Sequence, residues 1–416
     1  MTKAPEICVA GGGLSGRLTA LALAHSGFAV TLVDRQSLSA APDDGRTTAL
    51  AYAGVRMLIR LGVWDALLPK AQPITDIVVS NGEPRDRFRP GKLSGGQLHF
   101  PATLLSGERM PADAPALGYI VENRDLLAAL GEALAPAGVT IREGVSIIDY
   151  DAAPSRGRGR LRLQGGEVLE PLLLIACDGK RSPLRAAMNI KTMGWDYGQS
   201  AIIVNLTHEK PHHGTAHEIF YPDGPFAILP MQGNNVSIVW TEKRERVRSY
   251  LALDEAAFLA AARERVGDHL GALSLASPRQ SYPLSFLYAP KLTAERFALA
   301  GDAGHGIHPI AGQGFNLGIK DIAALCDVLS EARDTGLDIG HGAVLARYDS
   351  WRRFDTAALA FGTDALVRLF SNDFGPLKQV RGLGLGIVQR SDMARRFFMR
   401  VSGADLGDLP GLMQPL

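Results

Sequence analysis

The chain has few cysteines, no long apolar run and almost no net charge. Its 416 residues include three cysteines, Cys8, Cys177 and Cys326, which lie far apart in apolar surroundings and form no CxxC motif. This excludes a disulfide framework and a cysteine-based metal cluster, and predicts buried thiols in a reducing compartment. The formal net charge of +1 gives no basis for nucleic-acid binding as the main activity.

The sequence also gives no support for a membrane-spanning or a secreted protein. No run of about 18 uninterrupted apolar residues occurs. The first residues pass directly into an apolar stretch, with no room for a signal peptide. The content of 46% hydrophobic and 21% charged residues is that of an ordinary α/β protein, long enough for one large or two intertwined domains. We therefore expect a cytoplasmic globular protein that could lie peripherally on the inner membrane.

The N-terminal stretch up to Asp34 does contain a strong pattern. An apolar strand over Ile7–Ala10 is followed by GGGLSG at residues 11–16, a helix expected from Arg17 to His25, and a second strand over Val30–Val33 that ends at Asp34. This order of strand, GxGxxG, helix, strand and acid is the dinucleotide-binding unit. It does not by itself separate NAD from FAD.

Each residue type in this unit has a physical role. Gly11 would make the tight turn, Gly13 would admit a pyrophosphate, and Gly16 would let the helix pack closely on the strand. Asp34 would accept hydrogen bonds from the ribose hydroxyls.

A second glycine-rich stretch runs from Leu299 to Leu325. A strand is expected over Phe297–Ala300, and a helix, marked by apolar residues near helical spacing, is expected to begin near Asn316. The glycines between them remove side chains from one face, so a flat polar ligand could approach the backbone. Free N–H groups at the start of the helix would favour negative charge on that ligand.

The remaining segments predict a mixed architecture. Residues 73–110 and 200–240 alternate in the manner of antiparallel strands, while Leu172–Ala176 is fully apolar, as a buried parallel strand should be. We expect an α/β fold (α+β overall), with a Rossmann-type domain of discontinuous segments, an antiparallel β-sheet domain threaded through it, and C-terminal helices. The expected bounds are 1–72, 111–185 and 280–342 for the first domain, 73–110 and 186–279 for the second, and 343–416 for the helical region.

Two arginines lie near the expected nucleotide site. Arg46 lies in a polar loop, residues 43–50, that leads into a helix expected over Ala51–Leu61, and both phosphate contact and simple exposure are open for it. Arg124 falls in the first turn of a helix expected to start near Asn123. A cation there opposes the helix dipole, which favours an anionic partner for Arg124.

Three motifs occur in a fixed order: GxGxxG at residues 11–16, DGxxSxxR at 178–185 and GD at 301–302. Together they resemble the single-component flavin monooxygenases related to para-hydroxybenzoate hydroxylase. The run HPIAGQGFNLGIKD at 308–321 is similar to the signature of the ubiquinone-biosynthesis hydroxylases of the UbiH/UbiF type. The resemblance covers most of the chain, including GPFAILP at 224–230, RLFSND at 368–373 and RGLGLG at 381–386.

The resemblance implies a bound FAD and places parts of the chain along it. The glycines of the first motif would hold the pyrophosphate, Asp302 the ribityl chain, and Pro309 with the 312–316 loop the isoalloxazine. The implied cofactor-binding residues are Gly11, Gly13, Leu14, Ser15, Gly16, Asp34, Arg35, Arg46, Arg124, Asp178, Asp302, Pro309, Gly312, Gln313, Gly314 and Asn316. No catalytic residue and no metal ligand is assigned.

The implied activity is an FAD-dependent aromatic-ring monooxygenase of ubiquinone biosynthesis. It would hydroxylate a polyprenyl phenol or benzoquinol intermediate with O2 and NAD(P)H, through a flavin C4a-hydroperoxide that a second domain could shield from water. Backbone donors of the helix near Asn316 would stabilise the charge of the reduced flavin. Because no second GxGxxG exists, NAD(P)H is expected to bind transiently. The choice between NADPH and NADH, the ring position, the tail length, the substrate-orienting residues and the oligomeric state stay open.

Other interpretations stay open as well. The chain could hydroxylate a soluble aromatic compound or secondary metabolite, or serve as a non-catalytic FAD-binding subunit of a biosynthetic complex. A plain NAD-dependent dehydrogenase fits the other motifs less well. Asp302, His305 and His308 could form a non-haem iron triad, but the glycine-rich loop would then have no use.

The C-terminal segment from Phe374 to Ser402 mixes basic and apolar residues. Its basic residues are Lys378, Arg381, Arg390, Arg395, Arg396 and Arg400, against Asp392 alone. A helix packed on the body with a solvated basic face is one interpretation. Docking on anionic lipid, where a polyprenylated substrate resides, is the other. Other ubiquinone-biosynthesis proteins are expected as partners, and nucleic acid is not.

Overall fold

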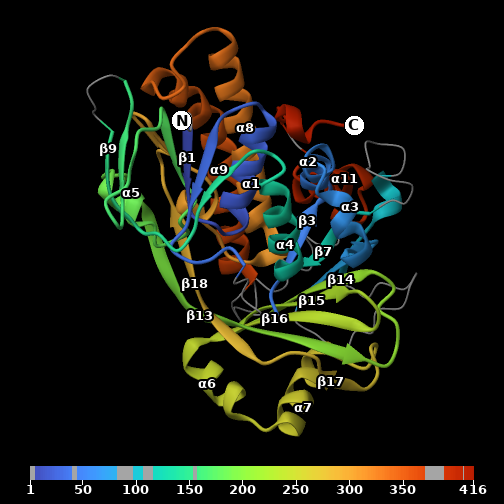
Figure 1. The fold of residues 1–416 in the computed structure, drawn as a ribbon. Helices are drawn as coiled ribbons and strands as arrows, with labels where there is room; N and C mark the ends of the chain where they lie inside the picture. Colours follow the sequence, from blue (N-terminus) through green and yellow to red (C-terminus); the bar gives the residue numbers. More distant parts are fainter. Residues whose placement is uncertain are drawn as a thin grey trace.

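Two large sheets organise the part of the chain that the structure describes (Figure 1). The structure is a computed structural model that describes residues 5–39, 45–81, 97–105, 116–152, 157–370, 388–405 and 407–416. One sheet has six strands, five of them parallel, and forms the nucleotide-binding part. The other has nine strands and lies below it in Figure 1, with two helices on its far face.

The six-stranded sheet confirms the predicted dinucleotide-binding unit. Its order is β19-β20-β12-β1-β2-β8, with β19 antiparallel at the edge. The strands are β1 (Ile7–Ala10), β2 (Val30–Val33), β8 (Thr140–Arg142), β12 (Leu173–Ala176), β19 (Thr293–Ala294) and β20 (Phe297–Leu299). Strands β1, β2, β12 and β20 are buried along their whole length, as apolar strands covered on both faces should be.

Helices α1 (Leu14–His25), α4 (Asn123–Leu134), α8 (Gln313–Asp334) and α9 (Gly342–Phe370) pack around this sheet (Figure 1). Helix α1 begins at Leu14, ahead of the predicted start at Arg17. Helix α8 begins at Gln313, also ahead of the predicted start near Asn316. In both cases the glycine-rich turn enters the helix directly, so the first free N–H groups come from the motif itself.

A small three-stranded sheet corrects one prediction. Residues 43–50 were expected to form a loop, but Thr47–Ala51 is strand β3, which pairs antiparallel with β7 (Gly118–Glu122). Strand β4 (Gln72–Ile74) pairs on the other side of β7, and helix α2 (Tyr52–Arg60) follows β3 directly. The strand forms because its partner β7 lies far away in the chain, a contact that local sequence does not reveal.

The nine-stranded sheet confirms the predicted antiparallel region. Its strands are β5 (Asp76–Ser80), β6 (Gln97–Pro101), β13 (Met193–His208), β14 (Thr215–Tyr221), β15 (Gly224–Met231), β16 (Asn235–Lys243), β17 (Leu273–Leu275), β18 (Gln280–Tyr288) and β21 (His305–Gly306). All pairs are antiparallel except β14 with β5. Residues 76–80 and 97–101 thus join residues 193–288 in one sheet, through pairing between distant parts of the chain.

The two faces of this sheet differ because successive side chains of a strand point to opposite sides. On the outer face Ile202, Phe226 and Trp240 are fully buried against Phe258 of helix α7 (Glu255–Val266), beside helix α6 (Arg244–Ala252). The inner face carries smaller residues and is turned toward the nucleotide-binding part.

The remaining elements lie at the surface of these two parts. They are β9 (Ile147–Asp151), β10 (Arg160–Leu163), β11 (Val168–Leu169), α3 (Trp64–Leu67), α5 (Pro183–Ala187) and α11 (Asp392–Ser402), with short 3-10 turns between them. Cys8, Cys177 and Cys326 are free and buried, as predicted. Among the described residues, no helix combines the length and apolarity that a membrane crossing requires.

Part of the predicted C-terminal region lies outside the described residues. This applies to 371–387, and so to half of RLFSND, all of RGLGLG, Lys378 and Arg381.

Candidate functional site

A cavity of about 610 Å³ connects the glycine-rich turn after β1 with the inner face of the nine-stranded sheet. Nine of the predicted site residues line it: Gly13, Leu14, Ser15, Asp34, Arg46, Asp302, Pro309, Gly312 and Gly314. Gly11, Gly16, Arg35, Arg124, Asp178, Gln313 and Asn316 do not line it. The two glycine-rich motifs, although far apart in the chain, therefore meet at one cavity.

The three motif glycines of the first turn have different surroundings. A Cβ on Gly16 would lie 1.6 Å from the carbonyl oxygen of Gly11, and a Cβ on Gly11, whose φ is +106°, would lie 2.5 Å from that of Cys177. These two glycines let helix α1 sit directly on the turn. Gly13 is exposed, and a Cβ there would meet nothing within 4 Å. The open space beside Gly13 is where a ligand can approach the backbone.

Asp34 closes one end of the groove. Its carboxylate accepts hydrogen bonds from the backbone N–H of Gly12 and, at 2.6 Å, from that of Gln36. These bonds fix the carboxylate at the edge of the cavity, with further lone pairs for a ligand hydroxyl. Gln36 and Ser37 also line the cavity, whereas Arg35 between β2 and Gln36 is exposed away from it.

Arg17 lines the cavity and was not identified by the sequence argument. Its buried guanidinium donates to the carbonyl oxygens of Gly12 at 2.7 Å, Leu127 at 2.8 Å and Leu38 at 2.7 Å. Burial lowers the pKa of this guanidinium, although Asp34 and Glu143 act in the opposite direction. Arg17 holds three walls of the groove together, and its position directly after the motif was the signal that could have found it.

The second glycine-rich motif presses against the first. Gly301 has a φ of +63°, and a Cβ there would lie 2.5 Å from the hydroxyl oxygen of Ser15. A Cβ on Gly318 of helix α8 would lie 3.1 Å from the Cα atom of Gly301. This close contact of α1, the loop and α8 leaves the exposed Asp302 carboxylate facing the cavity.

Helix α8 presents its N-terminus to the same cavity. Its N-cap residue Gly312 has a φ of +62°, and both Gly312 and Gly314 line the cavity. The first N–H groups of the helix have no partner within the helix and carry the positive end of its dipole. This end of the cavity therefore favours a ligand with partial negative charge.

Asn316 lies behind this N-terminus rather than in the cavity wall. Its amide nitrogen donates to the carbonyl oxygens of Ala49 at 2.8 Å and Gly312 at 3.2 Å, and its amide oxygen accepts from the N–H of Ala51 at 2.9 Å. Asn316 thus ties α8 to β3. Its predicted contact with FAD stays a prediction, as does that of Gln313, whose amide donates to the carbonyl oxygen of Ser402.

The two histidines of the loop have separate environments. Nε2 of His305 bonds to the buried Asp321 carboxylate at 2.5 Å. His308 is 1% exposed, packs edge-on against Tyr197, and has a pKa that burial lowers to about 4. Asp302 points instead to the cavity, and among the described residues no group of three potential ligands could hold a metal ion.

The two arginines predicted to contact FAD differ in position. Arg46 lines the cavity, with its guanidinium carbon 5.1 Å from the centroid of the Tyr282 ring. Arg124 is half exposed and pairs with the Glu122 carboxylate at 2.9 Å, so it has an anionic partner within the chain. Contact of either arginine with FAD stays a prediction.

The DGxxSxxR motif links β12 to the second glycine-rich loop. Ser182 caps helix α5 by accepting from the N–H of Arg185 at 2.9 Å, and the Arg185 guanidinium donates to the carbonyl oxygens of Ala303 at 2.7 Å and Lys180 at 2.9 Å. Burial raises the pKa of Asp178, which accepts from the N–H of Leu184. The motif therefore supports the Gly301–Ala303 turn from behind.

The opposite wall of the cavity belongs to the nine-stranded sheet, and the sequence argument assigned none of its residues to the site, although Ala227 and Leu229 lie in the GPFAILP run. They are Ala201, Ile203, Glu218, Ala227, Leu229, Ser237, Val239, Tyr282 and Leu284. Every second residue of the strands contributes, so the alternation in β13, β15 and β16 was the available signal. The wall is mostly apolar and carries small side chains at its centre.

These features fit FAD. Two helix N-termini, α1 and α8, point donors into one groove that lacks side chains at Gly13 and Gly314. Acceptors for hydroxyl groups stand at Asp34 and Asp302. An extended ligand with a pyrophosphate, hydroxyl-bearing linkers and a flat ring that takes up negative charge matches this order of groups.

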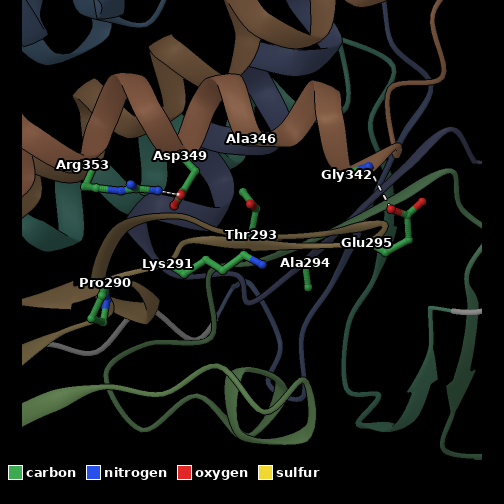
Figure 2. Close-up of a pocket in the computed structure, with 9 residues that line it drawn as sticks. All are labelled: Pro290, Lys291, Thr293, Ala294, Glu295, Gly342, Ala346, Asp349 and Arg353. Atoms are coloured by element: carbon green, nitrogen blue, oxygen red, sulfur yellow. Dashed lines mark hydrogen bonds and ion pairs between the residues drawn. The ribbon is translucent and has the colours of Figure 1, made fainter.

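A second hollow, of about 730 Å³, lies outside this region (Figure 2). It is formed by the segment around β19 and by helix α9, and none of the predicted site residues lines it. Both of its carboxylates bond within the chain: Glu295 accepts from the N–H of Gly342 at 2.9 Å, and Asp349 pairs with Arg353 at 2.6 Å. Figure 2 shows both contacts at its rim.

Comparison with known proteins supports the cofactor. Residues 4–356 match the family model described as "FAD binding domain". The chain is 41% identical over 413 residues to "Ubiquinone hydroxylase UbiL" of Rhodospirillum rubrum, covering 96% of this chain and 89% of that protein. It is 34% identical over 402 residues to "3-demethoxyubiquinol 3-hydroxylase" of Escherichia coli, covering 95% and 98%.

A solved structure supports the fold. The p-nitrophenol 4-monooxygenase PnpA from Pseudomonas putida superposes with a TM-score of 0.78 over 98% of this chain and 100% of that chain, at 18% sequence identity. At this identity the likeness concerns the fold alone. It confirms the predicted combination of a nucleotide-binding part with a β-rich part.

Proposed function

The chain belongs to the FAD-binding hydroxylases, the para-hydroxybenzoate-hydroxylase-like flavin monooxygenases, and on that premise we propose that it hydroxylates an aromatic ring in ubiquinone biosynthesis. The substrate is a polyprenyl phenol or benzoquinol, O2 supplies the new oxygen atom, and NAD(P)H is the transient reductant. FAD is the bound cofactor.

One observation carries this proposal. A single cavity has a dinucleotide groove at one end and an apolar sheet face at the other. The groove alone would suit any dinucleotide enzyme, but the sheet face provides a wall for a flat apolar ring beside Pro309 and the N-terminus of α8. A flat aromatic substrate can therefore lie between the sheet and the flavin-binding loop.

The family resemblance and the lining of the cavity together support an assignment of the residues that would hold FAD. Gly13, Leu14 and Ser15 at the start of α1 would bind its pyrophosphate, Asp34 its ribose, and Asp302 its ribityl chain. The N-terminus of α8 would face the part of the ring that gains negative charge. FAD bound there would carry the two electrons from NAD(P)H that are needed to activate O2, and O2 would be the oxidant for ring hydroxylation.

The chain itself positions the reactants and limits access of water. Ala201, Ala227 and Val239 give the sheet wall small apolar side chains, which leave space for a ring while providing no competing hydrogen bonds. Lys180 lines the cavity and donates to the carbonyl oxygen of Ser285, so its stem bridges the two parts. Burial lowers the pKa of Lys180, against the opposing effect of Asp302.

Two measurements test the function. Purified protein should carry FAD, and a short-chain prenylated phenol should stimulate its NAD(P)H oxidation and yield one added hydroxyl group by mass spectrometry. Cells lacking the protein should accumulate an under-hydroxylated quinone precursor. FAD binding without NAD(P)H-driven reduction would instead favour a non-catalytic subunit, and an unchanged quinone pool would refute the proposed substrate.

We further propose that helix α11 contacts an anionic membrane surface, where a polyprenylated substrate resides. Met393 is 81% exposed and Phe397 is 54% exposed, and with Arg396 and Arg400 they follow the i, i+3, i+4, i+7 spacing of one helix face. Met399 is buried on the opposite side. An apolar face flanked by arginines suits the headgroup region of a membrane that contains acidic lipids.

Vesicle co-sedimentation tests this contact. The double variant Met393→Ser/Phe397→Ser should bind vesicles containing acidic phospholipid several-fold less than the parent. Phe354→Ser on α9 removes a side chain that is 79% exposed and serves as the matched control. Equal binding by the parent and the double variant would refute the proposed role of α11.

A further inference from the structure

We propose that Ser237 and Asn205 form a subsite that binds a hydroxyl group of the substrate ring and so selects a phenol or quinol over its methyl ether or quinone. This rests on the proposed function and adds the feature of the substrate that the protein recognises. Neither residue belongs to any motif of the sequence.

The position of the two residues follows from the register of the sheet. Asn205 on β13 lies directly opposite Ser237 on β16. Directly opposed residues of an antiparallel pair point to the same face, with Cβ atoms about 5 Å apart. Ser237 lines the cavity, so this shared face is the inner one. The two side chains therefore lie side by side on the inner face, with Ser237 in the cavity wall and Asn205 beside it, just outside the residues that line the cavity.

Both side chains have a polar atom without a partner. The hydroxyl oxygen of Ser237 and the amide oxygen of Asn205 accept or donate no hydrogen bond among the described residues. Ser237 is 0% exposed and Asn205 is 6% exposed. Buried polar atoms are rarely left unpaired, because each one costs the desolvation of its group. Two such atoms on one rung of a sheet point to a third group that bonds to them.

The next pair on the same face of these two strands has its hydrogen bond made within the chain. Thr207 and Asn235 are directly opposed on the same face, and the Thr207 hydroxyl donates to the Asn235 amide oxygen at 2.8 Å. Thr207 is exposed, outside the cavity. The exposed pair is thus hydrogen-bonded within the chain, while the two oxygen atoms of Ser237, in the cavity wall, and of Asn205 beside it are not.

The chemistry of the pair defines the group that it would bind. A ring hydroxyl can donate to the Asn205 amide oxygen and accept from the Ser237 hydroxyl at the same time. A methoxy oxygen or a quinone carbonyl can only accept, and would leave the amide oxygen of Asn205 unpaired. A site built to bond a hydroxyl rejects the analogue that lacks it more strongly than an apolar pocket rejects an extra methyl group.

The neighbours of Ser237 in the cavity wall are apolar. Leu229 lies opposite Ser237 on the neighbouring strand β15, and Ile203 and Val239 flank the rung along β13 and β16. A hydrogen bond made there is shielded from water and orients the ring in one direction. The subsite would therefore set which ring edge faces the flavin-binding loop.

Ligand titration of the full-length, FAD-loaded protein tests the subsite. A short-chain prenylated phenol and its methyl ether are added separately, and binding is followed by the change in flavin absorbance. The parent should bind the phenol about 10-fold or more tightly than the ether. Ser237→Ala and Asn205→Ala should each weaken phenol binding about 10-fold and leave binding of the ether nearly unchanged.

Stability and a matched control separate this effect from a general loss of structure. Ser237→Ala removes a buried unpaired hydroxyl, so its melting temperature should equal or exceed that of the parent. Thr207→Val, on the neighbouring rung, should leave the affinities for both compounds unchanged.

The possible outcomes are distinct. If the parent hydroxylates the phenol but Ser237→Ala binds it equally well, an internal water satisfies the pair and the subsite is refuted while the proposed function stands. If the parent binds neither compound, the proposed function and the subsite both fail.

Discussion

Nε2 of His305 lies 2.5 Å from the carboxylate of Asp321, and neither side chain is exposed to solvent. The same carboxylate accepts from Nε of Arg352 at 2.9 Å and from the N–H of Gly301 at 3.3 Å. Burial acts to raise the pKa of Asp321, but His305 and Arg352 lower it on balance, so the carboxylate stays ionised. One residue of α8 thereby connects the second glycine-rich loop with helix α9.

Replacement of Asp321 by asparagine should be strongly destabilising. The change leaves the fully buried Arg352 without its main counter-charge, which costs about 3–5 kcal/mol in the free energy of unfolding. Chemical denaturation measures this cost, and FAD titration should show weaker binding because the Gly301 turn loses an anchor. Asp334→Asn, at the exposed end of the same helix, should cost no more than about 0.5 kcal/mol. Equal stability of the two variants would contradict this role of Asp321.

Two glycine substitutions in the first motif should differ in their effect on folding, because one variant should fold and the other should not. Gly13→Ala adds a Cβ to open space at a backbone conformation that alanine tolerates, so the protein should fold and bind FAD at least about 10-fold more weakly. Gly16→Ala places its Cβ 1.6 Å from a backbone oxygen and should prevent folding. Thermal unfolding without added FAD, together with FAD titration, distinguishes the two. Full FAD affinity in Gly13→Ala would show that the cofactor lies elsewhere.

Asn316 should hold helix α8 in position against strand β3. Asn316→Ala leaves the N–H of Ala51 and the carbonyl oxygen of Ala49 without their partner, at about 1–3 kcal/mol for each buried group. We expect a lower melting temperature and a weaker affinity for FAD. Asn316→Asp keeps the acceptor for Ala51 and loses the donor to Ala49, so its loss should be intermediate. A variant with unchanged stability would show that β3 and α8 are held together in another way.

A histidine cluster under the nine-stranded sheet should make the protein sensitive to acid. The rings of His217 and His269 lie 4.9 Å apart, and those of His208 and His212 lie 5.4 Å apart. Burial lowers the pKa of His217 to about 3 and lowers those of His269 and His208 below the usual value. The folded protein therefore favours the neutral forms of His217, His269 and His208.

The direction of the pH effect follows from the difference between the histidine pKa values of the folded chain and those of the unfolded chain. An unfolded chain takes up these protons near pH 6.5, whereas the folded chain resists, so stability falls as the pH drops below about 6.5. For His217 the loss is about 1.4 kcal/mol per pH unit and continues down to its folded pKa. The free energy of unfolding, measured by denaturation between pH 7.5 and 5, should fall steeply as the pH drops. His217→Gln should reduce this slope by the equivalent of about one bound proton. Substitution of the exposed His25 is the control. An unchanged slope in His217→Gln would rule out His217 as the source of the pH dependence.

Local signals explain what the sequence predicted well. The first strand, glycine turn, helix, second strand and Asp34 depend on neighbouring residues, and the structure confirms them apart from the earlier start of α1. The meeting of the two glycine-rich motifs was also predictable, because a known family carries both.

Non-local contacts explain what the sequence did not predict. Strand β3 exists through its pairing with β7, and α8 starts at Gln313 through a glycine cap and the bonds of Asn316 to β3. Glycine-rich segments have weak helix propensity, so the start of α8 at Gln313 was not predicted. The sheet wall of the cavity was missed because its members, among them Ser237, belong to separate strands with no shared motif.

The strand order of the six-stranded sheet has a consequence for protein synthesis. Strand β20 and helix α8 pack beside β12 and α1 but are translated long after the first glycine turn. Chains fold from the N-terminus as they emerge, so a ribosome-bound chain has its pyrophosphate turn well before the loop that would bind the ribityl chain and ring. Cofactor loading is therefore a late event, and a nascent chain halted before α8 would be unable to retain FAD.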